Sequence, residues 1–190
     1  MRWNAPPRRG GTRPGQAGQG IVEFALVGGL FFFLVLSIVN AGLFLYGRNT
    51  VEYASDVGVA MLAAEGQVAS TNLPPGTPAG SYNADQVAIL WMDADGLNTQ
   101  PLLTVTSIAI CKETQSGTTF VNNGPCDTFT YSTSGATDTD LWSPAGRYVD
   151  AAAPGPDFAS LTINYNYQVV ASTARFNLSD STVFRLEPQQ

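Results

Sequence analysis

The amino-acid sequence predicts an α+β fold: one long N-terminal helix, membrane-embedded in its first half, followed by a small antiparallel sheet of three or four strands. Residues 24–46 contain no charged side chain, and as a helix they would span roughly 35 Å at about 1.5 Å per residue. That length crosses a hydrocarbon core of about 30 Å with a slight tilt. Farther along the chain, short runs alternate apolar and polar residues, as half-buried strands do.

The segment before the apolar helix is basic, and the segment after it is acidic. Four of the nine basic residues lie in residues 1–18, which contain no acidic residue. All fifteen acidic residues lie from Glu23 onward, together with only five bases. Because positive flanks remain cytoplasmic, we expect residues 1–18 to form a cytoplasmic leader and residues 71–190 an extracytoplasmic α+β head domain. An acidic exterior also argues against a nucleic acid as partner.

The junction between leader and apolar helix reads GQGIVEFALV from residue 18. Gly18 is followed by Gln19, and then by Glu23 and Phe24 at the fifth and sixth positions after the glycine. This pattern resembles the start of TadE-like pseudopilins, minor components of tight-adherence (Flp-type, type IV-like) pilus machines. The C-terminal residues 177–188 resemble that family only loosely.

The resemblance implies a minor pilin or pseudopilin that a prepilin peptidase cuts between Gly18 and Gln19. Glycine suits such a site because it leaves an extended backbone unencumbered. By the same resemblance, Glu23 would align subunits by neutralising the new α-amine of a neighbour, and the chain from Phe24 onward would pack the core of the assembly. The head is larger than that of the major Flp pilin, which argues against the main shaft subunit.

The implied partners are the prepilin peptidase, other pilin subunits, assembly-platform proteins and the membrane. The implied location is the cytoplasmic membrane, crossed once by residues 19–46, with incorporation into a surface pilus as a later step. An alternative is a signal-anchored binding protein that stays uncut and recognises a ligand outside the cell. Asn40 and the small residues of the helix either serve helix–helix contact or reflect the ordinary composition of membrane helices.

The helix is expected to continue beyond the membrane as an amphipathic extension over residues 47–70, giving one helix over about residues 21–69. Apolar residues recur there at helical spacing: Val51, Ala54, Val57, Met61, Ala64 and Val68. A linker follows at residues 71–81, where two adjacent prolines forbid a helix. A second, short helix is expected at residues 84–95, capped by Asn83 or Ser81 and stopped by Gly96.

Strand-like alternation predicts the sheet from four runs: residues 102–110, 128–132, 161–171 and 181–186. The Asn-Asn-Gly-Pro sequence at residues 122–125 is the strongest turn signal. Residues 135–156 are expected to form a polar loop, in which Trp142 and Tyr148 either mark a contact surface or close the edge of the core.

Two cysteines, Cys111 and Cys126, both lie in the part of the chain expected to be translocated. An oxidising compartment would allow them to pair, and a disulfide at the base of a hairpin fits their spacing. The alternative is two free thiols.

The composition argues against an enzyme. Histidine is absent, which removes the commonest general base and metal ligand and any Ser-His-Asp triad. Neither a P-loop, nor a nucleotide-binding glycine pattern, nor zinc-ligand spacing is present. Asp93, Asp95 and Gly96 hint at a calcium loop but lack its further ligands. We therefore expect neither cofactor nor metal. An anchored hydrolase would need two acids flanking a cleft.

Overall fold

The computed structural model describes residues 16–65, 73–77, 81–132, 135–139, 141–149 and 156–187. The chain forms two compact units, Met1–Ala41 and Gly42–Gln190. Of the first unit, residues 16–41 are described, and all are helical. Most of the expected leader, the expected helix end at residues 66–70 and part of the linker lie outside the described residues.

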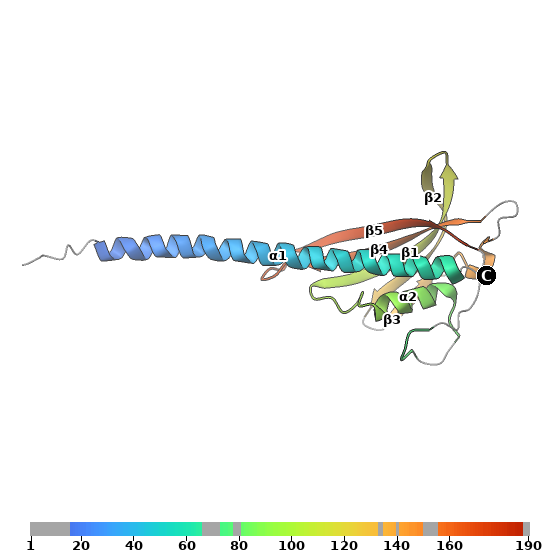
Figure 1. The fold of residues 1–190 in the computed structure, drawn as a ribbon, viewed down its shortest axis with the longest axis horizontal. Helices are drawn as coiled ribbons and strands as arrows, with labels where there is room; N and C mark the ends of the chain where they lie inside the picture. The colour runs from blue at the N-terminus through green and yellow to red at the C-terminus, as the bar shows by residue number, and fades with distance from the viewer. Residues whose placement is uncertain are drawn as a thin grey trace, which may run out of the picture. The chain divides into compact units, whose positions relative to one another are not determined.

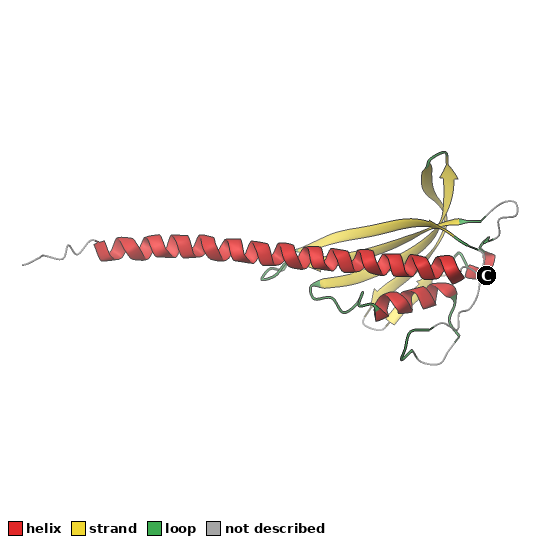
Figure 2. Cartoon of the chain, viewed as in Figure 1, coloured by secondary structure: helices red, strands yellow, loops and turns green. Residues whose placement is uncertain are grey.

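The second unit confirms the α+β class: helices accompany an antiparallel sheet (Figures 1 and 2). The sheet has five strands in the order β3-β2-β1-β4-β5, where three or four were expected. Their bounds are β1 Leu103–Ser116, β2 Thr119–Ser132, β3 Gly135–Thr139, β4 Phe158–Gln168 and β5 Arg175–Arg185. The additional strand, β3, lies in the segment expected to be a polar loop. It extends the sheet by pairing with the end of β2.

The predicted turn at residues 122–125 is wrong. The β1–β2 turn lies at Gly117, whose φ is +65°, and the Asn-Asn-Gly-Pro sequence lies inside β2. There the register shifts, so that residues 123–125 oppose Lys112 alone. A bulge of this kind favours the same residue types as a turn, because a glycine permits close approach and a proline needs no ladder partner. A Cβ atom on Gly124 would lie 2.8 Å from the Lys112 backbone oxygen.

Helix α1, Gln16–Glu65, packs its second part against the sheet. Its buried positions there are Gly47, Val51, Ala54, Ser55, Gly58 and Leu62. The apolar positions expected to form the buried face of this helix are therefore correct at residues 51 and 54 but not beyond residue 54. There Val57 and Met61 are half-buried and Ala64 is exposed, and Val68 lies outside the described residues.

The buried positions follow the helical period of 3.6 residues, which reaches residue 58 and not residue 57. A Cβ atom at Gly58 would lie 2.6 Å from the Met92 sulfur and 2.9 Å from a Leu161 methyl. The glycine therefore lets α2 and the sheet approach α1 closely at this turn. Its cost to the helix is about 1 kcal/mol relative to alanine.

Helix α2, Ala84–Ala94, begins at a capping box. The Asn83 side chain accepts a hydrogen bond from the Gln86 backbone N–H at 2.8 Å, and Gln86 Oε1 accepts one from the Asn83 N–H at 3.1 Å. Gly96, with φ +97°, follows the helix end, since a left-handed residue there costs glycine little. The expected cap and stop are both confirmed.

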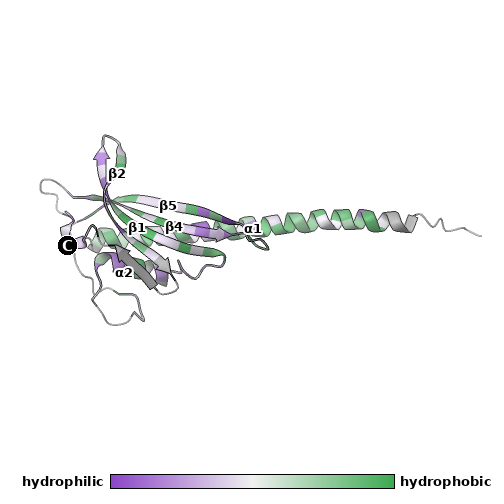
Figure 3. Ribbon diagram, turned by 180° about the vertical axis from the view of Figure 1, so that it is seen from behind, coloured by the Kyte–Doolittle hydropathy of each residue, from purple (hydrophilic) through white to green (hydrophobic). Residues whose placement is uncertain are grey.

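The core lies between the helices and one face of the sheet. Both α2 and the second part of α1 lie on this same face, as two opposite views show (Figures 1 and 3). The core residues of the sheet come from alternating positions, and those of β4 are Ala159, Leu161, Ile163 and Tyr165. Trp142 is also buried here, so it closes the edge of the core, whereas Tyr148 is exposed.

Candidate membrane and assembly segment

The first part of α1 is apolar and exposed. Large side chains around it are open to solvent, for example Phe24 at 79%, Phe32 at 67% and Ile38 at 72%, and Figure 3 shows its hydrophobic colouring. Among the described residues one helix, Gly20–Ala64, is long and apolar enough to cross a membrane. Leaving so many aromatic and aliphatic groups in water is unfavourable. The segment therefore indicates a single-pass membrane protein.

The two residues predicted to flank a processing site, Gly18 and Gln19, lie in the first turns of α1. The helix begins at Gln16, five residues before the expected Ile21. The structure therefore shows helical backbone where an extended one was expected. Glycine weakens a helix by about 1 kcal/mol relative to alanine, and the first N–H groups lack intrahelical acceptors. Unwinding the first turn of the helix at Gly18 and Gly20 consequently costs little free energy.

Glu23 lies one helical turn after Gln19, and both Glu23 and Phe24 are exposed. Neighbouring residues on a helix point about 100° apart, so the carboxylate and the ring face different directions. Between Arg13 and Arg48 the sequence holds no other charged side chain than Glu23. The acid therefore marks one specific position at the N-terminal margin of the apolar segment.

The polar side chains within the apolar segment bond to their own helix. Ser37 Oγ donates to the Phe33 carbonyl at 2.8 Å, and Asn40 Nδ2 donates to the Leu36 carbonyl at 2.9 Å. Each of the two side chains thus forms a hydrogen bond within the helix that does not depend on water. A Cβ atom on Gly28 or Gly29 would meet nothing within 4 Å, so this side of the helix leaves space for a close neighbour.

The spacing of Gly18, Gln19, Glu23 and Phe24 and the uncharged helix that follows can now be compared with known proteins. The family model for TadE-like protein matches residues 18–60. The predicted resemblance is thereby confirmed over this segment, which we call the TadE-like segment. No curated protein and no solved structure matches the chain. The TadE-like match supports a protein associated with a Tad pilus.

The head that follows the TadE-like segment contains the expected disulfide. Cys111 and Cys126 are joined, with Cα atoms 4.0 Å apart, and they are direct partners on the antiparallel strands β1 and β2. The bond closes the hairpin next to the bulge at residues 123–125.

A buried ion cluster, which the sequence did not reveal, joins three parts of the head. Arg147 donates to both carboxylate oxygens of Asp85 at 2.6 Å and to Asp127 at 3.1 Å. Asp127 in turn accepts from the backbone N–H groups of Leu141 and Trp142. The cluster thus holds α2, β2 and the segment after η1, Pro144–Gly146, against one another. Its role is structural.

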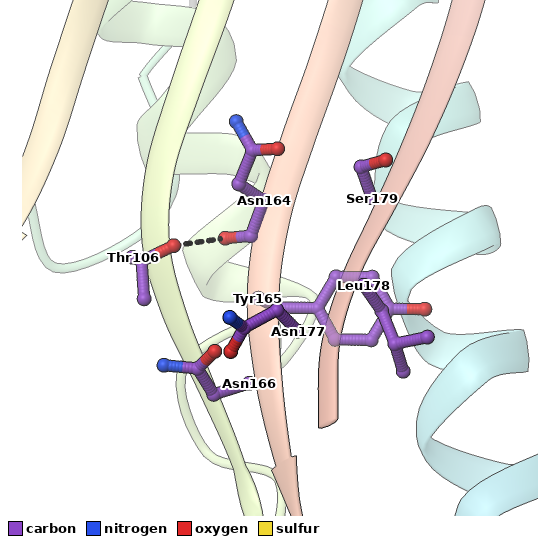
Figure 4. A pocket seen from close by; sticks show the side chains of 7 residues that line it. All are labelled: Thr106, Asn164, Tyr165, Asn166, Asn177, Leu178 and Ser179. Carbon is purple, nitrogen blue, oxygen red and sulfur yellow. Dashed lines mark hydrogen bonds between the residues drawn. The ribbon is translucent and has the colours of Figure 1, made fainter. Parts of the chain in front are cut away.

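An open cavity of about 410 Å³ lies on the sheet between β1, β4 and β5 (Figure 4). Its side chains are mainly amides and hydroxyls: Thr106, Asn164, Tyr165, Asn166, Asn177, Leu178 and Ser179. Thr106 Oγ1 donates to the Asn164 carbonyl at 3.0 Å, and Asn164 Nδ2 donates to Ser107 at 3.1 Å. Such a surface can exchange hydrogen bonds with a neutral polar ligand but offers no general base.

The described part of the chain holds no group of three or more Cys, Asp or Glu side chains placed to bind a metal ion. Asp93 and Asp95, which hinted at a calcium loop, lie at the end of α2, where Asp93 accepts a hydrogen bond from Asn98 at 2.6 Å.

Proposed function

We propose that this chain is a minor pilin-like subunit of a tight-adherence pilus or a related secretion machine, processed between Gly18 and Gln19. The TadE-like match begins at residue 18, the residue at which the Gly-Gln-x-x-x-Glu-Phe spacing begins. In this proposal α1 anchors the subunit in the cytoplasmic membrane and later packs against the helices of other subunits. Its exposed apolar surface supports both uses, because lipid and neighbouring helices each remove it from water.

The charge distribution and the disulfide support one orientation. The basic leader would remain cytoplasmic, and the acidic head would lie outside, where an oxidising compartment permits the Cys111–Cys126 bond. We further propose that the protein acts in assembly and not as an enzyme, since its sequence lacks histidine.

Cleavage is tested by mass spectrometry of the full chain co-expressed with a prepilin peptidase in bacterial membranes. We expect a mature chain beginning at Gln19. Gly18→Val should abolish this product, because a branched side chain obstructs the backbone at the cut, whereas Gly15→Val should not. An intact leader in the wild-type protein, with an active peptidase confirmed on another substrate, would refute the processing.

The role of Glu23 is tested by assembly. The proposal pairs this carboxylate with the α-amine of Gln19 on a neighbouring subunit, so Glu23→Ala should reduce incorporation into pili or pseudopili. Glu52→Ala is the matched control, because Glu52 is an exposed acid of the same helix outside the apolar segment. Equal incorporation of the two variants would contradict the pairing.

The second candidate function is an uncut, signal-anchored binding protein, and the cavity of Figure 4 favours it. Its amides and hydroxyls suit a neutral, hydroxyl-rich ligand. The N-terminal mass discriminates between the two functions, since the anchor retains its leader.

A further inference from the structure

One end of the head lies beside the last turn of the uncharged helical segment. Phe44 belongs to that segment, and its ring packs edge-on against Tyr167 of β4, with ring centroids 5.3 Å apart. Tyr167 is the penultimate residue of β4. Both rings belong to the second compact unit, so the end of β4 is fixed at the level where the apolar segment ends.

The β4–β5 turn at this level is held by two backbone hydrogen bonds, one to the residue before β1 and one within the turn. The Gln168 N–H donates to the Leu102 carbonyl at 2.7 Å, and the Val169 N–H donates to the Ala174 carbonyl at 3.1 Å. Figures 1 and 3 both show the turn next to α1. The turn therefore has a defined position beside α1.

This end of the head exposes apolar side chains that its own fold leaves open. Phe176 is the strand partner of Tyr167 and is 56% exposed. Leu45 and Tyr46, at the end of the apolar segment, are 55% and 58% exposed. Tyrosine at the end of a membrane helix, such as Tyr46, is typical of the bilayer interface.

The nearest basic side chains are suited to lipid phosphates. Arg48 follows Tyr46 on α1, and Arg175 precedes Phe176 on β5; both are exposed. On the head side of the apolar segment, the first acids of these two elements lie beyond the arginines: Glu52 is one helical turn after Arg48, and Asp180 pairs with Ile163 farther along the sheet. An arginine near an anionic membrane surface strengthens binding to it by electrostatic attraction.

We propose that the β4–β5 turn, together with Phe176 and Arg175, enters the lipid headgroup region of the membrane that α1 crosses. The head would then have a second attachment to the bilayer, formed by a hairpin whose Tyr167 lies 123 residues after Phe44 in the sequence (167 − 44) but packs against it in the fold. The proposal rests on α1 crossing the membrane but not on processing or on pilus assembly.

Spin labels on cysteine variants of the full chain test this contact, since the two native cysteines are joined to each other. The chain is reconstituted in vesicles of phosphatidylcholine with a minority of phosphatidylglycerol. Accessibility to oxygen and to a water-soluble nickel chelate is then measured for Phe176→Cys and for Ser172→Cys in the turn. Val121→Cys is the control in water, because Val121 is 46% exposed on the β1–β2 hairpin. Leu34→Cys is the reference within the apolar segment.

We expect the oxygen-to-nickel ratio at positions 172 and 176 to shift from the value at 121 toward that at 34. The additional change Arg175→Glu should move the ratio at 176 back toward water. Water-like ratios at both 172 and 176, with a lipid-like ratio at 34, would overturn the contact alone. A water-like ratio at 34 would overturn the membrane assignment itself. Loss of access to both reagents at 176, as burial against a second copy would produce, would also overturn the lipid contact.

Discussion

Arg147 and Asp85 form a bidentate ion pair inside the head, with both nitrogen–oxygen distances at 2.6 Å and both side chains only 1% exposed. The same guanidinium meets Asp127 at 3.1 Å and lies over the Trp142 ring, 4.6 Å from its centroid. One cation thus pairs with two carboxylates that are otherwise shielded from water.

Removing this cation should destabilise the head strongly. Arg147→Met leaves two buried carboxylates without a counter-charge, which costs about 3–5 kcal/mol in comparable buried pairs. Urea unfolding of the full chain in detergent, followed by tryptophan fluorescence, measures the loss. Arg185→Met, at an exposed position of β5, is the control and should change stability by less than about 0.5 kcal/mol. Similar unfolding midpoints for the two variants would show that the cluster is dispensable.

The cluster also predicts a dependence of stability on pH. Burial raises the pKa of Asp85 to about 6, with a further increase from Asp127, against the opposing effect of Arg147. In the unfolded chain the carboxyl has its ordinary pKa of 3.8. Between these values the folded state binds the proton more readily, so this group favours folding increasingly as the pH falls through 6.

We therefore compare the wild type with Asp85→Asn, which cannot titrate at this position. When the pH is lowered from about 7 to about 5, the free energy of unfolding of the wild type should increase by about 1 kcal/mol relative to that of the variant. Measuring the difference cancels the titration of the other acids. If the difference in free energy of unfolding between wild type and variant stays constant from about pH 7 to about pH 5, the Asp85 carboxyl does not titrate in this pH range.

The bulge in β2 should not tolerate a side chain at Gly124. A Cβ atom there would lie 2.7 Å from the Lys112 Cβ and 2.8 Å from its backbone oxygen, and backbone cannot rotate away as a side-chain end can. We expect Gly124→Ala to cost about 1–3 kcal/mol, as overpacking does. Gly146→Ala is the matched control, because a Cβ atom at Gly146 meets nothing within 4 Å. Thermal unfolding of both variants in parallel tests the prediction, which fails if their midpoints coincide.

The disulfide should contribute measurably to stability. Closing a loop of this length is worth about 3 kcal/mol in the chain-entropy model, so the double variant Cys111→Ser, Cys126→Ser should unfold at lower urea concentration. The wild type treated with reductant should approach the same midpoint. A double variant as stable as the oxidised protein would mean that the hairpin needs no covalent closure.

Alternation in the sequence located the strands where one face is buried. Leu161, Ile163 and Tyr165 point into the core and predicted β4 within a few residues of its bounds. The method failed where strands leave the core: residues 114–116 of β1 are exposed and pair with β2 beyond the end of β4. Without a buried face, those positions carry no periodic signal.

The candidate sites also differ in how far the sequence predicts them. The TadE-like segment was predictable because its evidence is local: a spacing of a few residues and an uncharged run directly after it. The ion cluster is not local, since Arg147 lies 62 residues from Asp85 and 20 from Asp127. Such charged residues are indistinguishable in the sequence from solvated ones until the fold brings them together.

The bond between Cys111 and Cys126 has a mechanical consequence. A pull applied between the two ends of the chain passes from β1 to β2 through the sulfur atoms and bypasses the fourteen residues between them. Those residues hold roughly 50 Å of extended chain, at about 3.6 Å each, that tension cannot release. The protruding hairpin therefore keeps its length under load.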